Sequence, residues 1–385
     1  MHTAMKSILL ALLLVPLTAL PAADQIAADN PALLQLRREA DIWLKAMPSS
    51  VMDKAKTAPS GDKHDYFSLA PYFWPNPSKP DGLPWIYRDG KVNPESRVGT
   101  DHDTLAKMCS QVETLALAYH FTHHEPYADK AALLLKVWFL DSATKMNPNL
   151  EYAQGIPGQN TGNRSGIIDT VSLIKITESA EWLTGAAAWT PELERGLREW
   201  FQSYLHWLRT SKNGIAEAES ANGHSSWCLV QTAAYAIFVG DKAEARKAVE
   251  KGRERVAKQI EPDGRQPLEL KRTKSYSYTL YNLDALFTLA EIGQRVGVDL
   301  FGFRTKDGRS LRAALDYVVP YFSSDKQWPD EQIEAIKKPD AALGCLLRRA
   351  AIAYHEPKYE ALLQGAKLAD RRFQLIWPPR LSTTD

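Results

Sequence analysis

The chain has 385 residues and a formal net charge of +1, and 44% of its residues are hydrophobic. The near-zero charge argues against nucleic-acid binding through a global field, and the hydrophobic fraction is ordinary for a globular protein with a large core. Three widely spaced cysteines, Cys109, Cys228 and Cys345, allow at most one disulfide and argue against a thiol zinc site.

The amino terminus has the pattern of a targeting segment. Lys6 gives a positive start, Ile8–Leu17 form an apolar run, and the small residues of Pro21–Ala23 stand near a cleavage site. The run is too short to span a membrane and has the flanks of a cleavable signal peptide. We therefore expect a signal peptide at residues 1–23 and a single domain at residues 24–385. The protein is expected to be exported, to the periplasm or to the medium, without membrane attachment after cleavage.

The remainder of the chain is predicted to be helical, because apolar residues recur at helical spacing and most loops are short. The expected helices are Pro31–Met47, Asp101–His120, Pro126–Leu140, Gly166–Leu183, Thr190–Thr210, Ser226–Val239, Asp241–Ile260, Ser275–Val296, Ser310–Tyr321, Asp330–Lys337, Ala341–His355 and Lys358–Phe373. So many antiparallel helices in one domain fit an α/α toroid.

The first of two long irregular segments, Ser49–Thr100, is rich in proline and glycine and also in aromatic residues. This composition indicates a packed, functional loop. Tyr72 and Trp74 are its candidates for sugar contact, and packing is the alternative for both.

The second irregular segment, Asn147–Ser165, ends immediately before a predicted helix. Asn163 and Arg164 at this position are suited to binding the carboxylate of a neighbouring sugar. A surface salt bridge is the alternative for Arg164. Gln154 is a weaker candidate for substrate contact.

A polar cluster at Glu217–Gln231 precedes an apolar run. Asn222 and His224 form a turn, and Ser225 or Ser226 is expected to be the N-cap of the following helix. The pair would therefore lie at the positive end of a helix dipole, where an anion is favoured. A structural histidine is the alternative.

A second cluster, Gln266–Leu283, combines one glutamate with cations and tyrosines. Tyr278 lies six residues after Arg272, close enough for both side chains to reach one cavity. A nearby guanidinium favours the phenolate form of a tyrosine, which suits proton transfer on a sugar. The alternative is that the tyrosines pack in the core and the cations form a solvated face.

Two motifs in these clusters are Asn222-Gly-His224 followed by Trp227, and Glu269-Leu-Lys-Arg272 followed by a tyrosine. Together they resemble the alginate lyase superfamily of polysaccharide lyases. The resemblance extends to the blocks Tyr66–Pro84, Asn93–Glu95, Trp138–Asp141, Met146–Leu150, Gln154 and Gly162–Asp169.

The chain departs from the family pattern at both motifs. The best-known alginate lyases have adjacent Asn-Asn-His, whereas a glycine separates Asn222 from His224 here. Their tyrosine stands seven residues past the arginine, and in this chain that position is Thr279. By the resemblance Tyr278 takes the role of the tyrosine, or Tyr281 if the helix begins differently.

The resemblance implies an all-α (α/α) barrel, an incomplete toroid with an open cleft and long cleft-lining loops. It also implies β-elimination on a 1,4-linked polyuronate, either polymannuronate (alginate) or, as the alternative, glucuronan. Asn222, His224 and Arg272 would neutralise the substrate carboxylate, and Trp227 and Tyr281 would contact sugar. The expected partner is an acidic polysaccharide, and neither a metal nor another cofactor is expected because these side chains already serve the carboxylate.

Stereochemistry constrains the proton transfers. In mannuronate and glucuronate the C5 proton and O4 lie on the same side, so Tyr278 could act as base and then as acid. In guluronate they lie on opposite sides, and a second base, His224, would be needed. The single-tyrosine hypothesis therefore predicts that guluronate linkages are largely refused.

Two other classes of protein remain open from the sequence. A glycoside hydrolase would need two carboxylates across a cleft, for which Asp169, Glu217, Glu219 and Glu269 are candidates. A polysaccharide-binding protein without catalysis would not need Tyr278 and His224 together.

Overall fold

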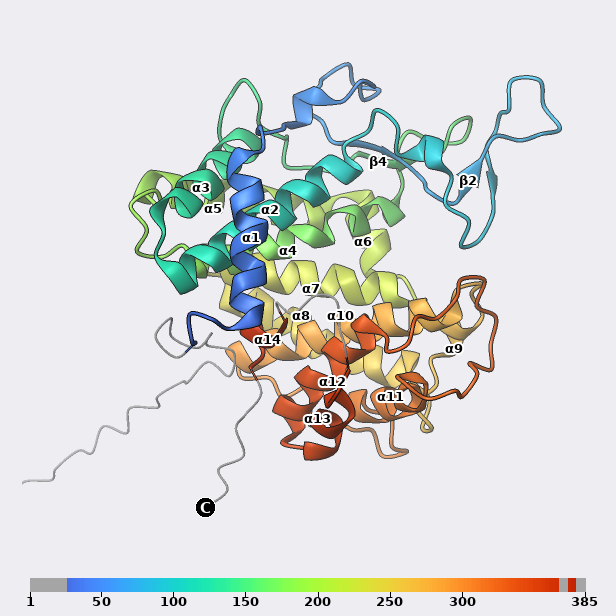
Figure 1. The fold of residues 1–385 in the computed structure, drawn as a ribbon. Helices are drawn as coiled ribbons and strands as arrows, with labels where there is room; N and C mark the ends of the chain where they lie inside the picture. The colour runs from blue at the N-terminus through green and yellow to red at the C-terminus, as the bar shows by residue number, and fades with distance from the viewer. Residues whose placement is uncertain (1–25, 367–372, 379–385) are drawn as a thin grey trace, which may run out of the picture.

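In the computed structural model, residues 26–366 and 373–378 are described. The expected signal peptide, residues 1–23, lies outside these ranges. Helices account for most of the described chain, and strands are few and short (Figure 1). Across the described ranges, no helix has the length and apolarity needed to cross a membrane.

The helices pack as the expected all-α (α/α) barrel with an open side (Figure 1). The α-helices are α1 (Pro31–Lys45), α2 (His102–Thr122), α3 (Glu125–Phe139), α4 (Ile174–Trp182), α5 (Pro191–Thr210), α6 (Lys212–Ala218), α7 (Gly223–Phe238), α8 (Lys242–Gln259), α9 (Pro267–Leu270), α10 (Ser275–Arg295), α11 (Leu311–Val318), α12 (Ala341–Tyr354), α13 (Pro357–Leu363) and α14 (Phe373–Ile376). Short 3₁₀ helices are η2 (Val51–Asp53), η3 (Pro94–Ser96), η4 (Arg164–Leu173) and η5 (Val319–Tyr321).

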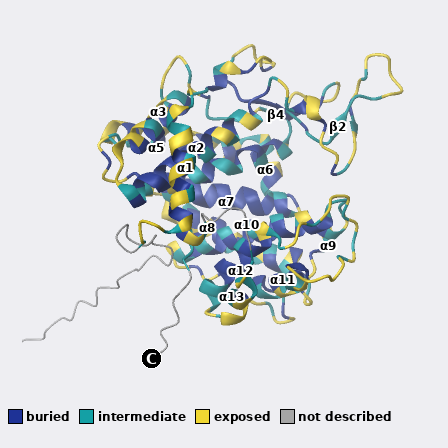
Figure 2. Ribbon diagram, viewed as in Figure 1, coloured by how far each residue is buried: buried dark blue, intermediate teal, exposed yellow. Residues whose placement is uncertain are grey.

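Helix α7 lies at the centre of the fold and packs against α5, α8 and α10. Residues 225–236 are all buried, and Figure 2 shows α7 as a dark core element. A helix that is buried on every face needs apolar or internally paired side chains all round, which explains the long apolar run after Trp227. The amino-terminal ends of α7 and α10 are thereby held side by side.

Two small sheets form within the segments predicted as loops. Strand β1 (Phe67–Leu69) pairs in parallel with β4 (Tyr152–Gly155), and β2 (Phe73–Trp74) pairs antiparallel with β3 (Ile86–Tyr87). The first pairing joins the two irregular segments, which are far apart in sequence. The β2–β3 hairpin projects from the same end of the barrel (Figure 1). These segments are therefore ordered walls rather than free loops.

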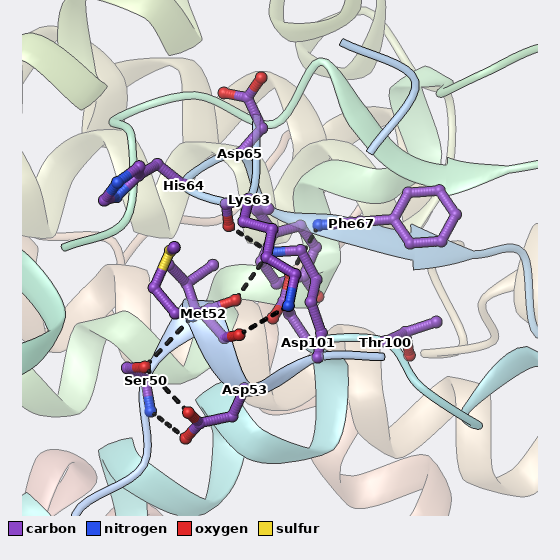
Figure 3. A network of polar contacts seen from close by, with 12 residues as sticks. Ser50, Met52, Asp53, Lys63, His64, Asp65, Phe67, Thr100 and Asp101 are labelled. Carbon is purple, nitrogen blue, oxygen red and sulfur yellow. Dashed lines mark hydrogen bonds and ion pairs between the residues drawn. The ribbon is translucent and has the colours of Figure 1, made fainter. Parts of the chain in front are cut away.

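A buried ion pair fixes the base of the first wall, as the polar network in Figure 3 shows. Lys54 Nζ lies 3.0 Å from Oδ2 of Asp101, and both side chains are almost free of solvent. The same Nζ donates to the backbone carbonyls of Val51 (2.8 Å) and Lys63 (2.6 Å). Asp101 also accepts the backbone N–H of Phe67 at 2.8 Å. This network ties the start of α2 to β1.

The predicted helix Asp330–Lys337 is wrong. This segment is irregular, and its backbone bonds reach the start of α10: Ser275 N–H donates to the carbonyl of Glu331 (3.1 Å), and Ile333 N–H to that of Thr273 (2.9 Å). Long-range pairing has replaced the local helical bonds. The segment consequently packs along the edge of the site described below.

Other helical predictions are correct in place but not in extent. The predicted Gly166–Leu183 helix is η4 followed by α4, with a break at Thr170 (φ −105°, ψ 15°). The predicted Lys358–Phe373 helix is the shorter α13, and its residues 367–372 lie outside the described ranges. The short helices α6 and α9 were not predicted, because each has too few residues to show apolar residues repeating at helical spacing.

Candidate active site

A cavity of about 660 Å³ opens where the amino-terminal ends of α7 and α10 meet the β2–β3 hairpin and β4. It brings together most of the residues singled out from the sequence: Tyr72, Gln154, Asn163, Asn222, His224, Arg272, Tyr278 and Tyr281. Three others, Trp74, Arg164 and Trp227, are not among its lining residues. Residues from four separate parts of the chain therefore share one concave site.

Helix α7 begins at Gly223, with Asn222 as its N-cap. The prediction of Ser225 or Ser226 as the N-cap is wrong, because distant side chains satisfy the first turn. Glu269 accepts the N–H of Gly223 at 2.8 Å. The Asn222 side chain makes no capping bond, which leaves its amide available at the cavity surface.

His224 is oriented by a buried carboxylate on α6. Its Nδ1 lies 2.5 Å from Oε1 of Glu217, which has no exposed side-chain surface. Glu217 also accepts bonds from Arg164 Nη1 (3.1 Å) and Ser220 Oγ (3.0 Å). Because an ionised carboxylate only accepts hydrogen bonds, a neutral imidazole beside an ionised Glu217 would carry its hydrogen on Nδ1 and keep a lone pair on Nε2. Arg164 thus forms a salt bridge behind the histidine.

Tyr278 lies under the Arg272 guanidinium, whose Cζ is 4.0 Å from the ring centroid. Its hydroxyl donates to the hydroxyl of Tyr72 at 2.5 Å. Burial, followed by the bond to Tyr72, raises the pKa of Tyr278 well above its usual value, and the opposing effect of Arg272 is smaller. Arg272 does favour the phenolate, as expected, but burial and Tyr72 outweigh it, and sequence spacing does not reveal burial.

The charge of Arg272 is balanced by Asp89. Arg272 donates from Nε (3.0 Å) and Nη2 (2.6 Å) to Oδ1 of Asp89. Burial disfavours the ionised form of Asp89, but the bonds from Arg272 and from the backbone of Thr273 outweigh it and lower the pKa of the carboxyl. The positive charge expected at Arg272 is therefore present on the cavity wall, as part of an ion pair with Asp89.

Gln154 and Asn163 form part of the opposite wall. The Gln154 amide donates to Oδ1 of buried Asp169 at 2.7 Å, and its backbone N–H donates to Ser68 Oγ at 2.8 Å. Its φ of 48° lies in the left-handed region, which costs energy for a non-glycine residue. Asn163 donates to the carbonyl of Gln154 and accepts from the backbone of Ser165. Both amides thus brace the wall.

The two tryptophans expected to contact sugar make contacts within the protein and are not among the residues that line the cavity. Trp74 donates from Nε1 to the carbonyl of Lys91 at 2.9 Å. Trp227 is buried, donates to the carbonyl of Tyr281 at 3.1 Å, and has its ring centroid 5.1 Å from that of Tyr281. Tyr281 itself lines the cavity.

Some cavity residues carried no prediction from the sequence. Arg97, His102, Tyr87 and Lys274 line the cavity, and Asp89 holds Arg272. Local sequence gives no signal for Asp89, whose partner is 183 residues away. Within the described ranges, no group of three or more His, Cys, Asp or Glu side chains is arranged to hold a metal ion.

Comparison with known proteins identifies the class of protein to which this helical barrel and cavity belong. The sequence profile of the alginate lyase family matches residues 50–328. The chain therefore belongs to the alginate lyase family, and it is a polysaccharide lyase.

Solved structures support this assignment. An alginate lyase from Bacteroides ovatus is 41% identical, with a TM-score of 0.87, and the match covers 91% of this chain and 94% of that one. Alginate lyase A1-III from Sphingomonas species A1 shares the fold at 14% identity, with a TM-score of 0.51 and coverage of 90% and 95%. A variant of alginate lyase A1-III complexed with a tetrasaccharide is 17% identical, with a TM-score of 0.54 and coverage of 93% and 98%. No curated protein matches the chain.

Proposed function

We propose that the chain cleaves the 1,4-linked uronates of alginate by β-elimination, with His224 as the base and Tyr278 as the acid. The observation that carries this proposal is the presence, in one cavity, of a histidine fixed by a buried carboxylate and a tyrosine kept protonated by burial. General acid–base chemistry needs one group of each kind.

The reaction balances with these two groups. His224 Nε2 takes the C5 proton, the electrons of the C5–H bond form the C4=C5 double bond, and the C4–O4 bond breaks. Tyr278 gives its proton to the departing O4. The products are a 4,5-unsaturated uronate end and a new non-unsaturated chain end, and no water is consumed.

The substrate carboxylate must be neutralised as negative charge develops at C5. The Asn222 amide, which does not cap α7, would stabilise this charge together with the positive end of the 16-residue helix. Because Asp89 shares the charge of Arg272, Arg272 contributes to the reaction through its contact with the Tyr278 ring.

This assignment revises the single-tyrosine hypothesis. A tyrosine with a raised pKa is a poor base in the free protein but a suitable proton donor. With a separate base, the stereochemical reason for refusing guluronate disappears. We therefore propose alginate, with both mannuronate and guluronate linkages, as the substrate.

A glycoside hydrolase is not favoured by the arrangement of the carboxylates. Asp169 is buried and accepts bonds from Tyr66, Ser68 and Gln154. Glu217 is bound to His224 and Arg164, and Glu269 to the backbone of Gly223. Each of these three carboxylates is thus engaged by neighbouring groups of the protein, whereas a hydrolytic pair needs two carboxylates that face the scissile bond.

The test is incubation with polymannuronate, polyguluronate, glucuronan and a neutral glucan, with ultraviolet absorbance of the unsaturated product and reducing ends as readouts. We expect absorbance from both alginate polymers and none from the glucan, and a chelator should leave the rate unchanged. Reducing ends without absorbance would indicate a hydrolase. Faster cleavage of glucuronan than of both alginate polymers would overturn the substrate assignment.

A further inference from the structure

The hairpin β2–β3 contributes one residue to the site that neither the sequence motifs nor the elimination chemistry requires. Asp89 follows β3 and lies beside the turn that leads into α10. Its Oδ1 accepts bonds from Arg272 and, at 2.6 Å, from the Tyr87 hydroxyl. Its Oδ2 accepts the backbone N–H of Thr273 (2.9 Å) and the Thr273 hydroxyl (3.0 Å). One carboxylate thus fastens both the side chain and the backbone of this turn.

The approach of the hairpin to the turn is close at the next residue. A Cβ on Gly90 would lie 2.4 Å from Thr273 Oγ1 and 3.2 Å from Lys274 Cγ, and the glycine has a φ of 69°. A residue with a side chain would be strained there and would push the hairpin away. Gly90 therefore allows the hairpin to lie close enough to the turn for Asp89 to reach Arg272.

We propose that Asp89 is a positioning residue for the β-elimination, holding the Arg272 guanidinium over the Tyr278 ring and balancing its charge. This inference rests on the proposed function, because it assigns to Asp89 an effect on the proton donor. The guanidinium could move in two ways, by rotation of its long side chain and by tilting over the ring. The bonds from Nε and Nη2 to the fixed carboxylate of Asp89 restrict both movements.

Charge balance has a consequence for the proton donor. An unpaired cation 4.0 Å from the ring centroid would favour the phenolate. With Asp89 ionised beside it, Arg272 keeps its place, the carboxylate opposes part of that effect, and Tyr278 stays a phenol able to protonate O4. The titratable and charged groups of this cavity come from several elements. The hairpin and the residues after it provide Tyr72, Tyr87, Asp89, Arg97 and His102, and the turn and α10 provide Arg272, Lys274 and Tyr281. Glu334 lies in the later loop, and Asp169, His224 and Glu269 lie across the cavity.

The experiment compares the full chain with Asp89→Asn and with the control Asp81→Asn. Asp81 is an exposed carboxylate on the same hairpin that accepts the backbone N–H of Leu83, so both variants make the same charge change. Asn at position 89 keeps an oxygen for Thr273 but loses the charge that faces Arg272.

For Asp89→Asn we expect kcat to fall by about ten- to a hundredfold with KM nearly unchanged. The alkaline limb of its kcat profile should move to lower pH by roughly one unit or more, because an unbalanced cation favours the phenolate. Its crystal structure should show the Arg272 guanidinium turned from its wild-type orientation while its charge stays near the phenol. Asp81→Asn should match the wild type in each measurement.

An unchanged alkaline limb, or a crystal structure with Arg272 in its wild-type orientation, would overturn the inference and leave Asp89 as a fastening of the hairpin. Failure of the proposed function has a different signature, in which the wild-type chain releases no unsaturated product from any polyuronate. The position of Arg272 in the Asp89→Asn structure decides the positioning role in either case.

Discussion

The Nδ1 atom of His224 lies 2.5 Å from Oε1 of Glu217, a carboxylate with 0% side-chain exposure. The pair joins the first turn of α7 to the short helix α6, and Arg164 and Ser220 complete the bonds to the carboxylate. The contact fixes how the ring is turned, and for a neutral imidazole beside an ionised Glu217 it would place the hydrogen on Nδ1. In that form, His224 would be a base whose lone pair is on Nε2.

Replacing Glu217 by Gln should therefore remove the base without removing the histidine. The Gln amide can donate to Nδ1, which would move the hydrogen to Nε2 and leave no lone pair facing the substrate. We expect kcat to fall by about a hundredfold or more, as for other bases held in the wrong tautomer. Initial rates on alginate and thermal unfolding measure this. Arg164→Gln, which changes the same cluster at its exposed side, should lose less, and equal losses would contradict the tautomer argument.

Tyr278→Phe removes only the proposed donor hydroxyl. Kinetics on alginate should show kcat reduced by roughly two orders of magnitude with KM little changed. Tyr281→Phe is the matched control, because Tyr281 lines the same cavity one helical turn later and packs on Trp227. A variant pattern in which Tyr281→Phe is inactive and Tyr278→Phe is active would assign the donor to Tyr281.

The long helices could be predicted from sequence because apolar periodicity is a local signal. The start of α7 was placed too late, since its first turn is satisfied by Glu269, 46 residues further along the chain. The Asp330–Lys337 prediction failed for the same reason, as its backbone pairs with residues near Thr273. Local patterns do not report which distant groups will accept or donate a bond.

The candidate site was predictable to a similar degree. The six-residue spacing correctly brought Arg272 and Tyr278 together, and the cavity contains both. The direction of the Tyr278 pKa shift was not predictable, because it is set by burial and by Tyr72, 206 residues away. Asp89 was missed because its role exists only after the hairpin has docked.

Arg272 should not be replaceable by lysine. An ammonium group cannot give Asp89 the planar pair of donors or lie flat on the Tyr278 ring. We expect Arg272→Ala to lower kcat more than it weakens substrate affinity, with a loss on the order of 3 kcal/mol in transition-state stabilisation. Arg272→Lys should recover only part of this. Lys271→Ala, an exposed cation next in the chain, serves as the control, and full activity of Arg272→Lys would show that positive charge alone suffices.

The buried pair of Lys54 and Asp101 yields a prediction on stability. Lys54→Met fills the space of the stem but leaves the Asp101 carboxylate buried without its cation. Breaking such a pair costs about 3–5 kcal/mol in the free energy of unfolding, which urea or thermal denaturation measures at neutral pH. The control Lys258→Met removes an exposed partner of Glu254 (67% and 62% exposed) and should change stability by less than about 0.5 kcal/mol.

The loss in Lys54→Met should depend on pH with a defined sign. Burial already raises the pKa of Asp101 to about 6 in the folded protein, although Lys54 and the N–H of Phe67 oppose it. Removing the cation raises that pKa further, so the folded variant binds a proton that the unfolded chain, with a carboxyl pKa near ~3.9, has released. Stability of the variant relative to the wild type should thus be nearly restored at a pH below about 6, where Asp101 is protonated in both folded proteins, and should fall as the pH rises above that value. A deficit that stays constant across this range would show that lost packing, rather than an unpaired carboxylate, destabilises the variant.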